Sequence, residues 1–242
     1  LYARDKGFNT LLTFGGAHSN HIYATAAAGK LYGFNTIGII RGDELTATNE
    51  TLKFAASCGM QLLFVDRESY RNKHNADFLK DLENKFGQFY HLPEGGTNNL
   101  AIKGCEEILS PGDYNQFDYI CCCCGTGGTI SGIISASAGK STILGFSVLK
   151  GGFMKNEVST LLQNYNNYQY SNWQIIEDYH LGGYGKKTAL LLTFIEEFSG
   201  KTGIPLEFVY TGKLIFGIFE LLKKDFFKSG TKILAIHTGG LR

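Results

Sequence analysis

The sequence predicts an α/β protein of two domains, each an open, mostly parallel, twisted sheet with helices on both faces. Three observations lead to this fold class. Short apolar runs alternate with longer segments of helical period, which is the pattern of β-α units on a parallel sheet. The length of 242 residues is enough to bury substantial cores. The glycine pair Gly95–Gly96 is the best candidate for a boundary, so we expect a smaller domain over residues 1–95 and a larger one over 96–242.

The first domain is expected to hold three or four strands joined by helices. Glycines follow its first strand and end its first helix, as expected where the chain turns tightly. The expected order is a strand at 10–16, a helix from Ser19 to Gly33, a strand from Thr36, a helix from Glu50, a strand from Gln61, a charged helix from about Tyr70 to Lys85, and a strand from Phe89 into a loop at Pro93.

The second domain continues the alternation. An Asn-rich stretch at 163–172 is expected to be a surface loop, and 206–212 is expected to be a strand or the approach to a site. The other expected elements are a helix at 98–109, a strand at 118–124, a helix from Gly128, strands at 141–148 and 173–180, helices at 187–200 and 213–224, and a last strand at 232–240.

The composition excludes several classes of function. Lys and Arg number 23 against 22 Asp and Glu, which gives a net charge of +1, and no basic block supplies the charge that nucleic-acid binding requires. No apolar run is long enough to cross a bilayer, and the first ten residues lack the apolar core of a signal peptide. We therefore expect a cytoplasmic protein without nucleic-acid or membrane partners.

Four consecutive cysteines, Cys121–Cys124, precede a glycine-rich turn. Successive side chains of a strand point to opposite faces, so the four sulfurs cannot converge on one metal ion. A redox dithiol belongs at an exposed helix start, whereas these cysteines come before the turn. A strand covered on both faces needs a run of small apolar side chains, and free cysteine serves as one. Core packing is therefore favoured over metal or redox chemistry, and we expect no metal site.

Two glycine-containing loops stand where a strand is followed by a helix. In GTGGT, residues 125–129, backbone N–H groups, the positive end of the next helix and the Thr126 and Thr129 hydroxyls could hold a phosphate; a tight turn without a ligand is the alternative. In GGAHSNH, residues 15–21, Ser19 is expected to cap a helix, and the donors of the first turn could instead form a carboxylate site. Neither GTGGTISG nor AGKST, which begins at Ala138, has the spacing of a nucleotide-binding motif.

Four segments in a fixed order, closed by HTGG at His237, carry a resemblance that spans nearly the whole chain: GGAHSNH, PEGGTNNLAIKG at Pro93, GTGGTISG and VYTGKLIFGIFE at Val209. Together they resemble the pyridoxal-phosphate enzymes of the 1-aminocyclopropane-1-carboxylate deaminase and D-cysteine desulfhydrase family, of the tryptophan-synthase-β-like fold. The resemblance implies pyridoxal 5'-phosphate as cofactor, bound in a cleft between the two domains, a small amino acid as substrate, and a homodimer.

The family's site residues carry over by matching positions. The resemblance implies that the GTGGT loop holds the cofactor phosphate. It also implies that the Ser-Asn-His triplet binds the substrate carboxylate, that its Asn contacts the cofactor ring hydroxyl, and that its Ser and two tyrosines take part in catalysis. The implied residues are Gly125, Thr126, Gly127, Gly128 and Thr129 for phosphate, Ser19, Asn20 and His21 for substrate, and Ser19, Tyr184 and Tyr210 for catalysis.

Two departures from the family pattern bear on activity. In the deaminases a glutamate that faces the pyridine nitrogen follows the second tyrosine, whereas Thr211 stands here; this favours D-cysteine desulfhydrase-like elimination to pyruvate, sulfide and ammonia. The family's Schiff-base lysine is not matched, because Lys6 lies where a solvated lysine is expected; we expect that lysine upstream of Leu1. The alternatives are a 1-aminocyclopropane-1-carboxylate deaminase and a catalytically silent ligand-binding homologue.

Overall fold

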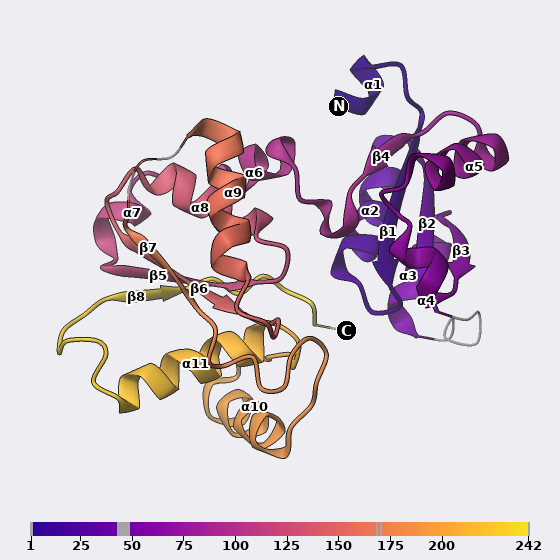
Figure 1. Cartoon of the computed structure of the whole chain (residues 1–242). Helices are drawn as coiled ribbons and strands as arrows, with labels where there is room; N and C mark the ends of the chain where they lie inside the picture. Colours follow the sequence, from indigo (N-terminus) through magenta and orange to yellow (C-terminus); the bar gives the residue numbers. More distant parts are fainter. Residues whose placement is uncertain (1, 43–48, 168, 170, 242) are drawn as a thin grey trace. The chain divides into compact units, whose positions relative to one another are not determined.

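The computed structural model describes residues 2–42, 49–167, 169 and 171–241 (Figure 1). The chain divides into two compact units, Leu1–Gly96 and Thr97–Leu241. Each unit contains one four-stranded parallel sheet. The predicted fold class, two α/β units with parallel sheets, is therefore confirmed.

The sheet of the first unit has the strand order β3-β2-β1-β4, and every neighbouring pair is parallel. Its central strands β1 and β2 are buried along most of their length, as expected for a sheet covered on both faces. The register pairs Gly16 with Arg41, so the two central strands end at the same edge. The strands are β1 (Thr10–Gly16), β2 (Asn35–Arg41), β3 (Gln61–Val65) and β4 (Tyr90–Leu92).

Helices cover both faces of this sheet. One apolar cluster joins the sheet to α2 and α3, and another joins it to α4 and α5. The charged helix predicted from about Tyr70 to Lys85 is wrong, because the chain forms two helices there and Asp66 and Asn75 each cap the start of one. The helical elements are α1 (Tyr2–Asp5), α2 (Asn20–Tyr32), α3 (Glu50–Ser57), α4 (Arg67–Arg71), α5 (Ala76–Phe86) and the 3₁₀ turn η2 (Glu94–Gly96).

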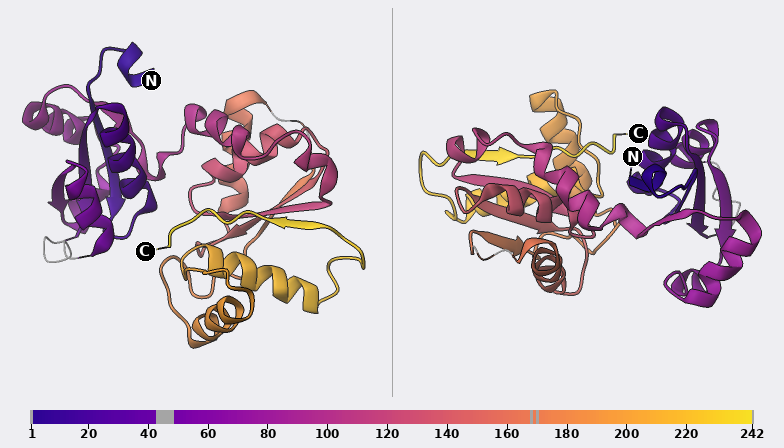
Figure 2. Two further views of the ribbon diagram at one scale, coloured as in Figure 1. Left: turned by 180° about the vertical axis from the view of Figure 1, so that it is seen from behind. Right: turned by 90° about the horizontal axis from the view of Figure 1, so that it is seen from above.

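The sheet of the second unit has the order β7-β6-β5-β8, again parallel throughout. β8 is an edge strand, drawn in yellow beside β5 in Figure 2. The strands are β5 (Tyr119–Cys124), β6 (Thr142–Ser147), β7 (Trp173–Ile176) and β8 (Ile233–Ala235).

Two groups of helices enclose this sheet, as Figure 1 shows. α8 and α9 pack on one face, and α10 and α11 pack on the other. The cysteines of β5 alternate between these faces: Cys122 and Cys124 join the α8/α9 cluster, whereas Cys121 and Cys123 join the α10/α11 cluster. All four are buried, which confirms their predicted packing role. The helical elements are α6 (Asn99–Cys105), η3 (Glu106–Ile108), α7 (Asp113–Gln116), α8 (Gly128–Ser137), α9 (Met154–Asn166), α10 (Ala189–Thr202) and α11 (Thr211–Lys223).

Five predicted elements of this unit differ from the structure. The strands expected at 173–180 and 232–240 are shorter, since β7 ends at Ile176 and β8 ends at Ala235. The α-helix expected at 98–109 ends at Cys105 and continues as a 3₁₀ turn. The loop expected at 163–172 is wrong over its first residues, because α9 extends to Asn166; residues 168 and 170 lie outside the described part. The segment 206–212 is no strand: its last two residues open α11. Within the described residues, no helix is both long and apolar enough to cross a membrane.

Candidate active site

The GTGGT loop connects the carboxyl end of β5 to the start of α8. Gly127 occupies the N-cap with φ +84°, a left-handed conformation that disfavours other residues. A Cβ on Gly128 would come within 2.9 Å of Thr97 Oγ1. Among the described side chains none caps α8 at Gly127, so the first N–H groups of this ten-residue helix are available to an anion. The loop therefore has the properties expected of a phosphate cup.

The two threonines of the loop already have polar neighbours. The Thr126 and Thr97 Oγ1 atoms lie 2.6 Å apart, and Thr126 is exposed. The Thr129 hydroxyl lies near the Cys105 thiol and opposes the rise that burial causes in its pKa. The sequence analysis assigned no role to Thr97, although the motif that contains it, PEGGTNNLAIKG, was singled out. Thr97 places a second hydroxyl beside the cup, while the Thr129 side chain is directed toward α6.

Tyr210 lies against the first glycine of the same loop. A Cβ on Gly125 would come within 3.2 Å of both the Tyr210 Oη and its Cε1. The Tyr184 ring meets Tyr210 edge to face, with centroids 5.9 Å apart and an interplanar angle of 73°. Burial, together with the neighbouring Tyr184, raises the pKa of Tyr210 far above its ordinary value. The second unit thus places Tyr210 against the GTGGT loop and Tyr184 against Tyr210, and Tyr210 stays protonated.

Thr211 is fully buried, and its side chain faces Glu207. Its Oγ1 accepts a hydrogen bond from the Glu207 N–H at 3.0 Å and donates to Glu207 Oε1 at 3.3 Å. The Glu207 carboxylate also accepts the backbone N–H groups of Val209, Tyr210 and Thr211, which caps the start of α11. The sequence analysis did not identify Glu207. The sequence could have indicated Glu207 only as an acidic residue just before a helix, a position where a carboxylate often caps.

Thr238, from the HTGG segment, adds a hydroxyl on the face of β5 that α10 and α11 cover, opposite to the face covered by α8. Its Oγ1 lies 3.4 Å from the Cys123 sulfur, and Cys123 belongs to the buried face below α11. The segment follows β8, which pairs with β5 in parallel, so both strand ends reach one edge of the sheet. Hydroxyl and backbone donors therefore gather at this carboxyl edge from three chain segments: Thr97, the GTGGT loop and the HTGG segment. This donor set fits an anionic phosphate ester with a heteroaromatic ring.

The predicted substrate triplet lies in the first unit, after β1. Ser19 is the N-cap of α2: its Oγ accepts the Ile22 N–H at 3.3 Å, as predicted. A Cβ on Gly15 would approach Ser19 Oγ to 2.9 Å and Ile22 Cγ1 to 2.5 Å, so only glycine allows this close turn. Asn20 is the first residue of α2. Since the start of a helix presents backbone donors, this end of α2 suits a carboxylate.

The His21 side chain, predicted to bind the substrate carboxylate, contacts Thr13 of β1 instead. The Thr13 hydroxyl donates to the Leu92 carbonyl at 3.0 Å, so its contact of 2.6 Å with His21 Nε2 must be an acceptance from Nε2–H. Burial lowers the pKa of His21 to about 4, with Glu94 opposing the shift. The neutral ring then offers only Nδ1, an acceptor, which cannot donate to a carboxylate.

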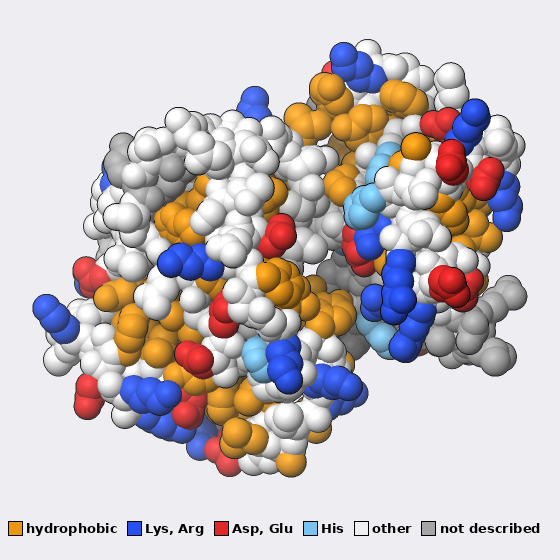
Figure 3. Space-filling model, viewed as in Figure 1, with side chains coloured by type: hydrophobic (Ala, Val, Ile, Leu, Met, Phe, Trp, Pro, Cys, Tyr) orange, Lys and Arg blue, Asp and Glu red, His pale blue; other side chains and the backbone are white. Residues whose placement is uncertain are grey.

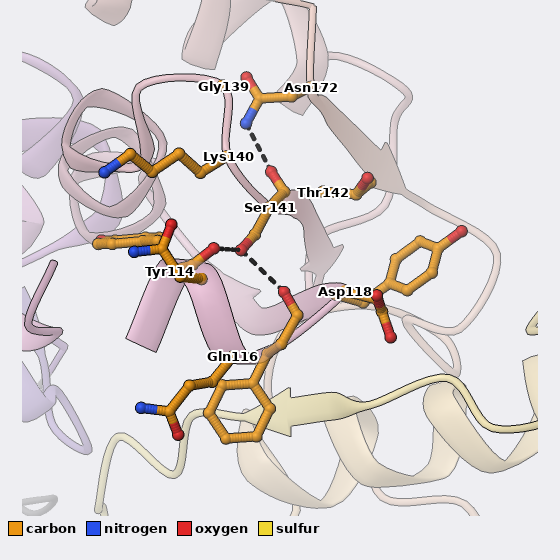
Figure 4. A pocket seen from close by; sticks show the side chains of 11 residues that line it. Tyr114, Gln116, Asp118, Gly139, Lys140, Ser141, Thr142 and Asn172 are labelled. Carbon is orange, nitrogen blue, oxygen red and sulfur yellow. Dashed lines mark hydrogen bonds between the residues drawn. The ribbon is translucent and has the colours of Figure 1, made fainter. Parts of the chain in front are cut away.

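A polar hollow of about 470 Å³ lies at the opposite, amino edge of the second sheet (Figure 4). Several of its polar groups are bonded to one another: Ser141 Oγ donates to the carbonyls of Tyr114 and Phe117, and Asn172 Nδ2 donates to the Ser141 carbonyl. The hollow therefore fixes the turn before β6 and takes no part in the candidate site. Among the described residues, no group of three or more His, Cys, Asp or Glu is arranged to hold a metal ion.

Comparisons with known proteins agree with this geometry. The profile of the family described as pyridoxal-phosphate dependent enzyme matches residues 2–239. A Pyrococcus furiosus protein named as a candidate 1-aminocyclopropane-1-carboxylate deaminase is 30% identical over 96% of this chain and 74% of its own length. A mitochondrial Arabidopsis thaliana protein, named bifunctional D-cysteine desulfhydrase/1-aminocyclopropane-1-carboxylate deaminase, is 31% identical over 99% of this chain and 65% of its length. The crystal structure of an ACC deaminase homologue matches with a TM-score of 0.82 at 27% identity, covering 99% of this chain and 76% of that one.

Proposed function

We propose, since this chain belongs to the pyridoxal-phosphate-dependent enzymes of the 1-aminocyclopropane-1-carboxylate deaminase and D-cysteine desulfhydrase family, that it is a lyase acting on D-cysteine. The family predicted from the sequence motifs is confirmed, and pyridoxal phosphate is the cofactor of that family. When bound, this cofactor supplies an electron sink that stabilises negative charge at the substrate α-carbon. The residues of the chain have to bind, orient and exchange protons.

The second unit supplies the groups proposed for the cofactor. Gly125, Gly127 and Gly128 bring backbone N–H groups of the loop and of α8 to the phosphate, and the Thr126 hydroxyl adds a side-chain donor. Thr97 supports Thr126 from the side through their 2.6 Å contact. Thr129 is proposed to contribute through its backbone N–H, because its hydroxyl lies near the Cys105 thiol.

Proton transfer is proposed for Tyr210, Tyr184 and Ser19. The buried Tyr210 hydroxyl keeps its proton at neutral pH and can donate it to a leaving group. Tyr184 is 42% exposed and contacts Tyr210 edge to face, so it is proposed to pass protons between Tyr210 and water. Ser19 accepts a hydrogen bond as a helix cap and still has its own hydroxyl proton to donate.

The substrate carboxylate is proposed to bind at the start of α2. Backbone N–H groups of the first turn and the positive end of the helix supply the attraction, and Asn20 contributes its amide. His21 takes part through its backbone N–H only, since its neutral ring is held by Thr13.

The observation that carries the choice of D-cysteine is the environment of Thr211. A carboxylate at this position would keep the pyridine nitrogen protonated and strengthen the electron sink, but a threonine is present. The nearby Glu207 cannot substitute, because its carboxylate is bound to three backbone N–H groups and to Thr211 itself. Elimination of a good leaving group such as a thiol needs less stabilisation of negative charge by the electron sink than opening a cyclopropane ring does. The cyclopropane acid is therefore the second candidate substrate.

The test is a product assay on the full-length protein with pyridoxal phosphate. D-cysteine and water should give pyruvate, ammonia and hydrogen sulfide in equal amounts, and turnover should exceed that of 1-aminocyclopropane-1-carboxylate to 2-oxobutyrate and ammonia. Faster production of 2-oxobutyrate would reverse the assignment. A protein that binds the cofactor but releases neither oxo acid would support a catalytically silent homologue.

Three further features belong to this proposal. We expect the Schiff-base lysine outside residues 1–242, so borohydride reduction and peptide mapping of the full-length protein should place the cofactor on that lysine and leave Lys6 unmodified. We also expect a homodimer, which sedimentation would detect, and a cytoplasmic location, which fractionation would detect.

A further inference from the structure

Lys213 is a charged side chain inside the core. It is the third residue of α11, and only 1% of it is exposed. Across the described residues, it is the one Lys, Arg, Asp or Glu in the buried class; Figure 3 shows other Lys and Arg side chains on the surface, interspersed with Asp and Glu. Lysine is rarely buried unless it has a partner, so a specific contact must hold it there.

That contact is the backbone carbonyl of Gly183. Lys213 Nζ donates to the Gly183 oxygen at 2.6 Å. The same oxygen accepts the Lys186 N–H at 3.2 Å. Burial lowers the pKa of Lys213 to about 8, with Glu207 opposing the shift, so the side chain remains largely protonated at neutral pH. A charged donor makes a hydrogen bond about twice as strong as a neutral one.

Gly183 belongs to a loop whose other attachments lie toward its ends, where Leu181 packs on the core and Lys187 lies over the Phe208 ring. Gly182 and Tyr184 through Lys187 are exposed, whereas Gly183 is buried. The backbone has positive φ at Leu181, Gly182, Gly183 and Gly185, and it is neither helix nor strand. The hydrogen bonds within the loop join Gly182 and Gly183 to His180, and Lys186 to Gly183. Lys213 therefore adds a hydrogen bond from α11 at the residue where the loop enters the core.

The residue after Gly183 is Tyr184. The orientation of the peptide between them sets where the Tyr184 side chain leaves the backbone, and Lys213 fixes that peptide through its carbonyl. Tyr184 in turn contacts Tyr210, which lies three positions before Lys213. One helix start thus carries Tyr210 and also the lysine that holds the loop of its partner tyrosine.

We propose that Lys213 is a positioning residue that holds the loop at 181–187 so that Tyr184 meets Tyr210. The catalytic purpose of this arrangement rests on the proposed function, whereas the ordering of the loop does not. Methionine at position 213 would fill similar space but would leave the Gly183 carbonyl without its charged donor.

The first test is amide hydrogen exchange on the full-length protein, with Lys213→Met compared with Lys223→Met. Lys223 lies on the same helix, and its side chain is 70% exposed in an ion pair with Glu220, so its substitution is the matched control. Exchange at Gly182, Gly183 and Lys186 should accelerate about tenfold or more in Lys213→Met and less than about twofold in the control. Unchanged loop exchange, with faster exchange spread through α11 instead, would overturn the proposal.

The second test is a double-mutant cycle on turnover with Tyr184→Phe. If Lys213 acts through Tyr184, the two substitutions together should cost about as much as the larger one alone, whereas additive losses would overturn the positioning role. If neither candidate substrate is turned over, the proposed function fails but hydrogen exchange still decides on the loop. If Lys213→Met does not fold, NMR of the unsubstituted protein decides: a slowly exchanging Lys213 ammonium with cross-peaks to Gly183 supports the proposal, and a freely exchanging one overturns it.

Discussion

The Tyr210 hydroxyl lies directly beside Gly125: a Cβ added to this glycine would come within 3.2 Å of Tyr210 Oη. The first residue of the phosphate cup thus borders the phenol proposed to donate a proton. If the loop binds the phosphate and Tyr210 donates the proton, as proposed, these two functions are coupled through one contact between side chain and backbone.

Gly125→Ala tests this coupling. Gly125 is absent from the residues with positive φ, so alanine is allowed by the backbone, and its effect comes from pushing Tyr210 by a few tenths of an ångström. We expect turnover to fall about tenfold, because small displacements of reacting groups are costly, with a loss of unfolding free energy of about 1 kcal/mol or less. Gly200→Ala is the control, since nothing lies within 4 Å of its added Cβ. Equal turnover in both variants would argue against a role for the contact.

The lowered pKa of His21 predicts that the stability of the first unit depends on pH. Its pKa is about 4 when folded and near 6.5 when exposed, so the unfolded chain binds more protons between these values and stability falls as the pH drops from 6.5 to 4. The full effect is about 3 kcal/mol. Urea unfolding of His21→Gln at pH 7 and pH 4.5 should show a smaller acid loss than wild type. His18→Gln, at an exposed histidine in the same motif, should behave like wild type.

The strands of both sheets could be predicted because their apolar runs and glycine turns are local signals. β1, β2 and β5 lie where the apolar runs predicted them. The break between α4 and α5 was missed because Asn72–Asn75 is polar on a stretch that is polar throughout, so the helical period shows no interruption. α9 was missed because its last turn is rich in Asn, and its burial of Met154, Val158 and Leu162 against the sheet outweighs that weak propensity.

The site could be predicted only as a set of motifs. The glycines of the cup and the two tyrosines were identified from the family pattern, and the structure gathers them at one sheet edge. Glu207 and Lys213 were not identified, because a capping carboxylate and a buried lysine look like surface charges in sequence. Only the fold shows that one binds three backbone N–H groups and the other a buried carbonyl.

The cysteine strand should be inert to alkylation in the folded protein. Burial raises the pKa of Cys121 to about 12 and that of Cys124 well above the ordinary range. The hydrogen-bonding interaction between Cys122 and Cys123 raises the pKa of Cys122 and lowers that of Cys123, so the inertness of Cys123 rests on its burial alone. At neutral pH, Cys121 then has about a thousandfold less thiolate than a free cysteine, and its sulfur is also shielded. Mass spectrometry after brief iodoacetamide treatment should find modification at the partly exposed Cys58 and none within 121–124. Rapid modification within the strand would contradict the packing role.

Thr211→Glu, the direct test of the electron-sink argument, needs a compensating change. Thr211 is fully buried and bonded to the Glu207 carboxylate, so a glutamate there places two acidic groups side by side in the core. We expect the single variant to lose about 2–4 kcal/mol of unfolding free energy, through like-charge repulsion and desolvation. Glu207→Gln in the same chain should recover part of that loss, because the charge is removed and the amide oxygen can still accept the Tyr210 and Thr211 N–H groups. The recovery is only partial because the amide NH2 group cannot accept the Val209 N–H.

The double variant then separates stability from chemistry. If Thr211 limits the sink, Thr211→Glu with Glu207→Gln should raise the ratio of 2-oxobutyrate formed from the cyclopropane acid to pyruvate formed from D-cysteine, whereas Glu207→Gln alone should leave that ratio unchanged. Product ratios are measured on protein whose thermal unfolding shows that it is folded at the assay temperature. A stable double variant with the ratio of the wild type would refute the assignment of substrate from Thr211, because the one chemical difference on which it rests would then have no effect on either reaction.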